Sequence, residues 1–126
     1  MYNYDGNTSY CFVAGNNNKA KAARNILIGQ GLESNKWRQV VLGSFNDPLE
    51  NGILLVGCGE SSSAKKNGLV VTWDGRVKAK GVPTEDDDVV RLKELKNLSK
   101  LIEGLTDAQI TALNKFAQSL VVEEVW

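Results

Sequence analysis

A fixed spacing of glycines constrains this chain more than any other feature of its sequence. Between residues 12 and 57, four short apolar runs each end on a glycine, and these glycines lie fourteen residues apart. A constant period indicates one structural unit that is repeated and stacked on copies of itself. The repeat glycines are Gly15, Gly29, Gly43 and Gly57.

Each apolar run before a glycine is too short for a helix and is bounded by turn-forming residues, such as the three asparagines at 16–18. The pattern therefore predicts strands, and the glycine lets the backbone leave each strand with a positive φ. The rest of each unit must hold a second short strand and a second turn. Stacked units pair their strands in parallel, which predicts a parallel β-roll of four coils over residues 11–64.

Apolar side chains occupy both faces of every predicted strand. Alternation places the first and third positions of a run on one face and the middle position on the other. A strand that is wet on one side would be polar there, so we expect one face inside the roll and the other against a neighbouring molecule. Four coils are about 19 Å tall, which is too thin to hold a core alone. We expect the middle positions to contact sister copies: Val13, Leu27, Val41 and Leu55.

The repeat stops after residue 64, and Val71 stands where a fifth glycine would fall. Asp74-Gly75 lies between two strand-like runs at 69–73 and 76–80, which predicts a tight type I′ hairpin. We expect this hairpin to cap the roll by covering its last strand, because an exposed strand edge promotes association. The roll with its hairpin is thus assigned to residues 11–81, after an N-terminal arm at 1–10.

Residues 82–126 are predicted to be helical. Pro83 marks the boundary, and apolar residues within 86–103 recur at the 3-4-3 spacing of a coiled-coil seam, over too few heptads to define one. Gly104 ends this helix, and Thr106 with Gln109 forms a capping box that opens a second. Whether the helices form a trimeric stalk or fold back as a hairpin is open. The seam supplies four more interface candidates: Leu95, Leu98, Ile102 and Leu105.

Two resemblances follow from these motifs. The run Asn25-Ile26-Leu27-Ile28-Gly29, recurring every fourteen residues, resembles the head repeats of trimeric autotransporter adhesins, which implies a left-handed parallel β-roll in a homotrimer. The runs 42–48, 54–59 and 69–77 are similar to segments of phage and prophage tail-fibre and baseplate-appendage proteins. Together they cover about residues 10–81. In the third copy Pro48 replaces the small residue that follows the glycine by five places, so that turn is expected to differ.

The resemblance implies a non-catalytic attachment component of a phage tail fibre or baseplate appendage. It would be homotrimeric, contact other tail or baseplate proteins, and belong to the virion tail assembled in the host cytoplasm. Three chains would carry repeated loops to a host receptor and gain avidity. Cell-surface polysaccharide is the receptor class that the resemblance suggests. Loop residues Trp37, Asn17 and Asn46 are the candidate receptor contacts.

Two other functions are weighed against this one. The first is a head fragment of a bacterial trimeric adhesin at the cell surface, although the sequence shows neither an export signal nor a membrane anchor. The second is a small glycan-cleaving enzyme. Its carboxylate pair would come from polar turns, where carboxylates normally face solvent, so we expect no enzymatic activity. The acids available for it are Glu33, Asp47, Glu50 and Glu60.

Composition excludes several classes of partner. Fifteen basic residues balance fifteen acidic ones, which argues against nucleic acid and against a polybasic membrane contact. No apolar stretch approaches about eighteen residues, so no membrane insertion is expected. The chain has no histidine, and Cys11 and Cys58 lack the CxxC spacing of zinc sites. We therefore expect neither a metal site nor a cofactor.

Overall fold

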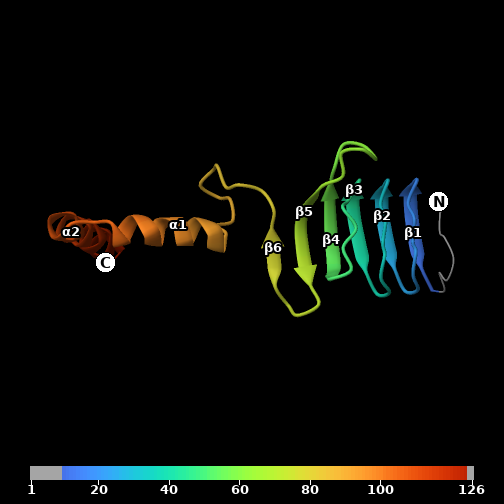
Figure 1. The fold of residues 1–126 in the computed structure, drawn as a ribbon, viewed down its shortest axis with the longest axis horizontal. Helices are drawn as coiled ribbons and strands as arrows, with labels where there is room; N and C mark the ends of the chain where they lie inside the picture. The colour runs from blue at the N-terminus through green and yellow to red at the C-terminus, as the bar shows by residue number, and fades with distance from the viewer. Residues whose placement is uncertain (1–9, 125–126) are drawn as a thin grey trace. The chain divides into compact units, whose positions relative to one another are not determined.

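The computed structural model describes residues 10–124, so the predicted N-terminal arm lies outside the described residues apart from Tyr10. The chain divides after residue 82 into a β unit and a helical unit (Figure 1). The β unit contains β1 (Phe12–Asn16), β2 (Ile26–Gln30), β3 (Val40–Ser44), β4 (Gly52–Cys58), β5 (Asn67–Thr72) and β6 (Val77–Ala79). The helical unit contains α1 (Leu92–Glu103) and α2 (Asp107–Glu124).

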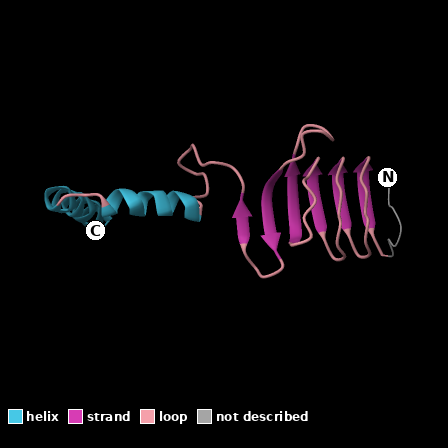
Figure 2. Cartoon of the chain, in the orientation of Figure 1, coloured by secondary structure: helices cyan, strands magenta, loops and turns pink. Residues whose placement is uncertain are grey.

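One six-stranded sheet runs through the β unit in sequence order (Figure 2). Strands β1 to β4 are parallel, and each repeat glycine lies opposite the next, from Gly15 through Gly29 and Gly43 to Gly57. The loops between them return along the coil, so the chain makes about three stacked turns rather than the four predicted coils. The fourth is missing because β5 reverses and pairs antiparallel with β4. The prediction of a mainly β roll followed by helices is confirmed at this level.

The repeat glycines are required by contact as well as by conformation. Gly29 has a φ of 148°, and a Cβ added to it would lie 1.9 Å from the carbonyl oxygen of Gly43. Gly15 stands in the same relation to Gly29, with a separation of 1.8 Å. Any side chain here would collide with the backbone of the next coil, so the stacking distance itself selects glycine.

The corners of each coil also use left-handed backbone. Arg24 and Arg38 precede their strands with φ of 59° and 62°, and Gly31 and Phe45 follow theirs with φ of 63° and 38°. Only two of the corner residues are of types that favour this conformation, Gly31 and Asn17 (φ 55°). The sequence gives no signal for the others, because their side chains are of types that normally avoid positive φ.

The interior of the roll is formed by the middle residue of each strand, and this corrects the predicted assignment of faces. Leu27, Val41 and Leu55 are fully buried within the single chain, and Val13 is 9% exposed. They pack with loop and hairpin residues that complete the core, namely Ala20, Leu32 and Val70. The middle positions therefore cannot form the contact with sister copies that the sequence predicted for them. The first and third positions face outward instead.

Buried amide side chains replace the second strand that the sequence predicted. Among the described residues, the loops that connect the strands make one parallel β-bridge, which joins Lys19 to Glu33. Asn18 instead donates from Nδ2 to the carbonyl oxygens of Ala14 and Gly29 at 2.9 and 3.0 Å. Gln39 likewise donates from Nε2 to the carbonyl oxygens of Leu49 and Gly52 at 2.6 and 2.7 Å. Such bonds give partners to backbone oxygens of the strands as well as of the loops.

The predicted hairpin is present, but its turn is of another type. Asp74 does not have positive φ, whereas Gly75 has a φ of 84°. The Gly75 N–H donates to the Thr72 carbonyl at 3.0 Å, and the Thr72 N–H donates to the Arg76 carbonyl at 2.8 Å. This is a three-residue loop, a type I turn followed by a left-handed glycine, in place of the type I′ turn. The hairpin still covers β4, as expected.

The helical unit begins later than the apolar spacing predicted. An Asp88 carboxylate oxygen accepts from the backbone N–H groups of Thr84 and Glu85, so this acidic run closes a turn rather than capping a helix. Helix α1 starts at Leu92, where the Glu94 side chain accepts from the Arg91 N–H at 3.0 Å. The capping box predicted for the second helix is confirmed by bonds between Thr106 and Gln109. Neither described helix has the length and apolar character needed to cross a bilayer.

Candidate functional site

A broad apolar surface covers the outward side of the sheet, and we call it the outer sheet face. It consists of the two outward positions of each strand, which the register aligns into two rows across all six strands. The first row is Phe12, Ile26, Val40, Leu54, Val71 and Val77. The second row is Ala14, Ile28, Leu42, Val56, Leu69 and Ala79.

The outer sheet face is open in the single chain. Phe12 is 57% exposed, Ile28 45% and Ile26 40%, and the central strands are half-buried only by their own neighbours. A soluble monomer rarely leaves so large a contiguous apolar area in water, so this face has the properties of a protein-contact surface. A polar row borders it where the parallel strands end: Asn16, Gln30, Ser44 and Cys58.

A second apolar surface lies on α1. Leu95, Leu98 and Ile102 are 55%, 52% and 43% exposed, and α1 buries no residue. Leu105 follows the helix and is half-buried. The structure thus leaves the predicted seam available for a partner helix but provides none, and its role in an interface stays a prediction.

Trp37, a predicted receptor contact, belongs to a cluster of aromatic and basic side chains. The centroid of its ring lies 6.1 Å from that of Trp73. The Arg38 guanidinium lies over the Trp37 ring, 4.2 Å from its centroid. The Lys36 ammonium lies 5.5 Å from the Trp73 ring, and the Trp73 indole donates to the Glu50 carbonyl at 3.2 Å. Trp37 therefore has packing partners, although 45% of it remains exposed.

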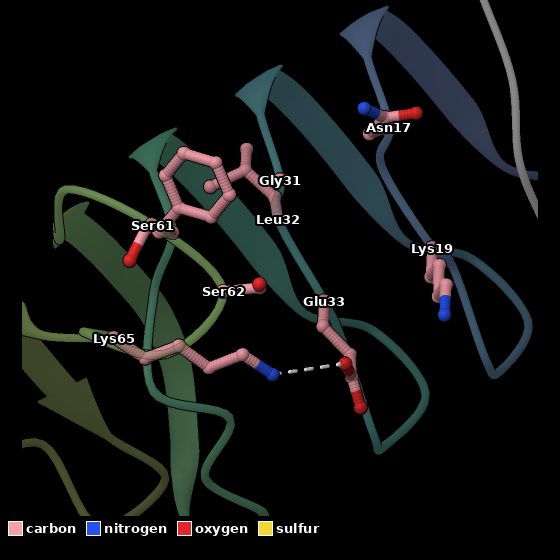
Figure 3. A pocket seen from close by; sticks show the side chains of 9 residues that line it. Asn17, Lys19, Gly31, Leu32, Glu33, Ser61, Ser62 and Lys65 are labelled. Atoms are coloured by element: carbon pink, nitrogen blue, oxygen red, sulfur yellow. Dashed lines mark hydrogen bonds and ion pairs between the residues drawn. The ribbon is translucent and has the colours of Figure 1, made fainter.

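The other two predicted contacts have opposite surroundings. Asn46 is fully buried and its amide is bonded to the backbone of Glu33, so its assignment as a receptor contact is wrong. Asn17 is exposed and lines a hollow of about 490 Å³ among the loops (Figure 3). Residues of three successive coils meet there with the loop at 61–65. The fourteen-residue spacing did not predict that this loop lies beside them. The remaining lining residues are Lys19, Gly31, Leu32, Glu33, Phe45, Ser61, Ser62 and Lys65.

Glu33 is a carboxylate of the β unit that two lysines hold in place. Its two oxygens pair with the ammonium groups of Lys21 at 2.6 Å and Lys65 at 3.5 Å, the latter drawn in Figure 3. Burial alone would raise the pKa of Glu33, but the hydrogen bond and charge of Lys21, together with Lys65, hold it below its ordinary value. A carboxylate held ionised by two lysines is poorly suited to act as a general acid.

The other acids considered for glycan cleavage, Asp47, Glu50 and Glu60, are solvent-exposed. Within residues 10–124, no group of three or more Cys, Asp or Glu side chains is placed to hold a metal ion. Cys11 and Cys58 form no disulfide, and the Cys11 thiol donates to the Ala22 carbonyl at 3.2 Å. No known protein family, curated protein or solved structure matches this chain. The surfaces described above are therefore the features that bear on function.

Proposed function

We propose that this protein is a non-catalytic structural and attachment component that works as a homotrimer. The observation that carries the proposal is the outer sheet face, which is apolar across all six strands and open in the single chain. Covering it would remove side chains such as Phe12 and Ile28 from water, at about 25 cal/mol for each Å² of apolar surface. A second copy of the same chain supplies the same surface, which is the requirement for a closed symmetric assembly.

Three copies fit this geometry. Each roll has one apolar flat side and loops elsewhere, so three rolls would place their outer sheet faces around a common axis and direct their loops outward. The seam of α1, with Leu95, Leu98 and Ile102 exposed, would supply a three-helix contact of its own. The resemblance of the repeat to trimeric adhesin heads, which implies a left-handed parallel β-roll in a homotrimer, supports an assembly of three copies.

The proposed setting is a phage tail fibre or baseplate appendage, within the virion tail. Support comes from the resemblance of the runs at 42–48, 54–59 and 69–77, and from a surface built for assembly rather than for chemistry. In such a particle the loops opposite the outer sheet face would remain free to contact a host receptor. The three-fold repetition of those loops would multiply weak contacts.

Light scattering coupled to size-exclusion chromatography tests the assembly. At micromolar concentration the full chain should have three times its mass of 13.8 kDa. Electron microscopy of phage particles induced from cells that carry the gene, labelled with an antibody to the chain, then tests the setting: label on the tail is the expected result. A stable monomer would overturn the first part of the proposal, and label elsewhere would overturn the second.

A further inference from the structure

The hollow of about 490 Å³ lies on the loop side of the roll and has the size of a small-molecule site. Its wall is built from equivalent positions of successive coils, with Asn17 and Lys19 from the first and Glu33 from the second. The loop that carries Ser61 and Ser62 closes it (Figure 3).

The aromatic floor of the hollow is held there at a conformational cost. Phe45 has a φ of 38°, although the equivalent corners of the two preceding coils use Asn17 and Gly31. Its ring lies directly over Gly31, where an added Cβ would meet Phe45 Cε1 at 2.3 Å. A bulky residue in the left-handed region is strained, and such strain concentrates at functional sites. The fold therefore does not require an aromatic side chain at position 45, since the equivalent corners are formed without one.

Cationic side chains outnumber carboxylates in the lining of the hollow, with Lys19 and Lys65 against Glu33. Glu33 is the carboxylate in the wall, and Lys21 and Lys65 already occupy its oxygens. Among the described residues, no carboxylate pairs with the Lys19 ammonium. The hydroxyls of Ser61 and Ser62 add groups that can donate or accept hydrogen bonds. An anionic group would complement this set, and the apolar ring calls for a ligand with a flat apolar side.

We propose that this hollow binds an acidic sugar, a pyranose ring that carries a carboxylate. The ring of Phe45 would contact the apolar side of the pyranose, the lysines its carboxylate, and the serines its hydroxyls. This inference rests on the proposed attachment function and names the chemistry of its receptor. The occupancy would be one sugar per chain, and therefore three per assembly.

Ligand-observed saturation-transfer NMR on the full chain tests the site, with D-glucuronate, D-galacturonate and N-acetylneuraminate as probes and D-glucose as the neutral match. At least one acidic sugar should bind with a Kd below about 10 mM, and glucose about tenfold more weakly or not at all. The Phe45→Asn variant places at this corner the residue that position 17 already uses, so it should fold as well as the parent. It should lower affinity about fivefold to tenfold. Lys65→Gln should lower the affinity for the acid but not for glucose.

Absence of binding by all three acidic sugars overturns the inference, as does unchanged affinity in folded Phe45→Asn. Equal affinity for glucuronate and glucose overturns the role of the lysines. Binding of inorganic phosphate that Phe45→Asn leaves intact would show a simple anion site instead. The oligomeric state is measured in the same samples by light scattering. A trimer without sugar binding refutes only this inference, and a monomer that binds refutes only the proposed function.

Discussion

The side-chain amide of Asn46 pairs with the backbone of Glu33 in the coil before it. Asn46 Nδ2 donates to the Glu33 carbonyl at 2.9 Å, and Asn46 Oδ1 accepts from the Glu33 N–H at 2.8 Å. Asn67 makes the same pair of bonds with Asp47, at 2.8 and 2.9 Å. An amide side chain thus makes the two hydrogen bonds that a neighbouring strand would make. This explains how the loop backbone opposite the sheet finds hydrogen-bond partners without forming a second regular sheet.

Replacing Asn46 with alanine should therefore lower the free energy of unfolding. Both bonds to Glu33 are lost, and its backbone groups are left without a partner, at a cost of about 1–3 kcal/mol. Urea denaturation followed by circular dichroism measures the change. The control is Asn51→Ala, at an exposed asparagine of the third loop, which should change stability by less than about 0.5 kcal/mol. Equal effects of the two variants would refute the structural role of Asn46.

The glycine stack predicts a larger effect. Gly29→Ala places a Cβ 1.9 Å from the Gly43 carbonyl oxygen, in a backbone with φ of 148°, so the coils cannot keep their spacing. We expect a loss of about 4 kcal/mol or more, or failure to fold. Gly81→Ala is the matched control, because nothing lies within 4 Å of its added Cβ. A Gly29→Ala protein with parental thermal stability would show that the coils are not stacked in this register.

Glu33 should give the roll a pH-dependent part of its stability. Lys21 and Lys65 lower its folded-state pKa below the ordinary 4.5, so its contribution is complete above about pH 4.5 and is lost as pH falls through the lowered value. Because the pair is partly exposed, the contribution is at most about 1 kcal/mol. The urea-unfolding free energies of the parent and Glu33→Gln should differ at pH 7 and converge toward pH 3. A difference that stays constant with pH would contradict the pairing.

The positions of the strands could be read from the sequence because each apolar run and its glycine form a local signal. The choice of inner face could not, since residues such as Leu27 and Ile28 are equally apolar. The direction of the chain at the corners decides which face points inward. Arg24 and Arg38 adopt a left-handed backbone there, which their residue types do not predict. The same corners turn the loops so that Leu27, and not Ile28, points into the coil.

The candidate sites show a similar division. Asn17 and Asn46 look alike in sequence, since both follow a repeat glycine in a polar loop, yet one lines the hollow and the other is buried. Burial of Asn46 depends on the backbone of the neighbouring coil, which is a long-range relationship. The hollow itself joins Asn17 to Ser61 and Lys65, and only the stacked coils bring them together. Capping at Thr106, by contrast, is local and was predicted correctly.

The mass of an Ile28→Lys variant tests the central claim most directly. Ile28 is 45% exposed on β2, within the outer sheet face, so a lysine there should leave the single chain folded while placing a charge in any contact between copies. The control, Asn51→Lys, adds the same charge in an exposed loop. Light scattering should give three times 13.8 kDa for the parent and for Asn51→Lys, and about a single chain mass for folded Ile28→Lys. A parent protein that is monomeric, or an Ile28→Lys variant that remains trimeric, would contradict the assembly through this face.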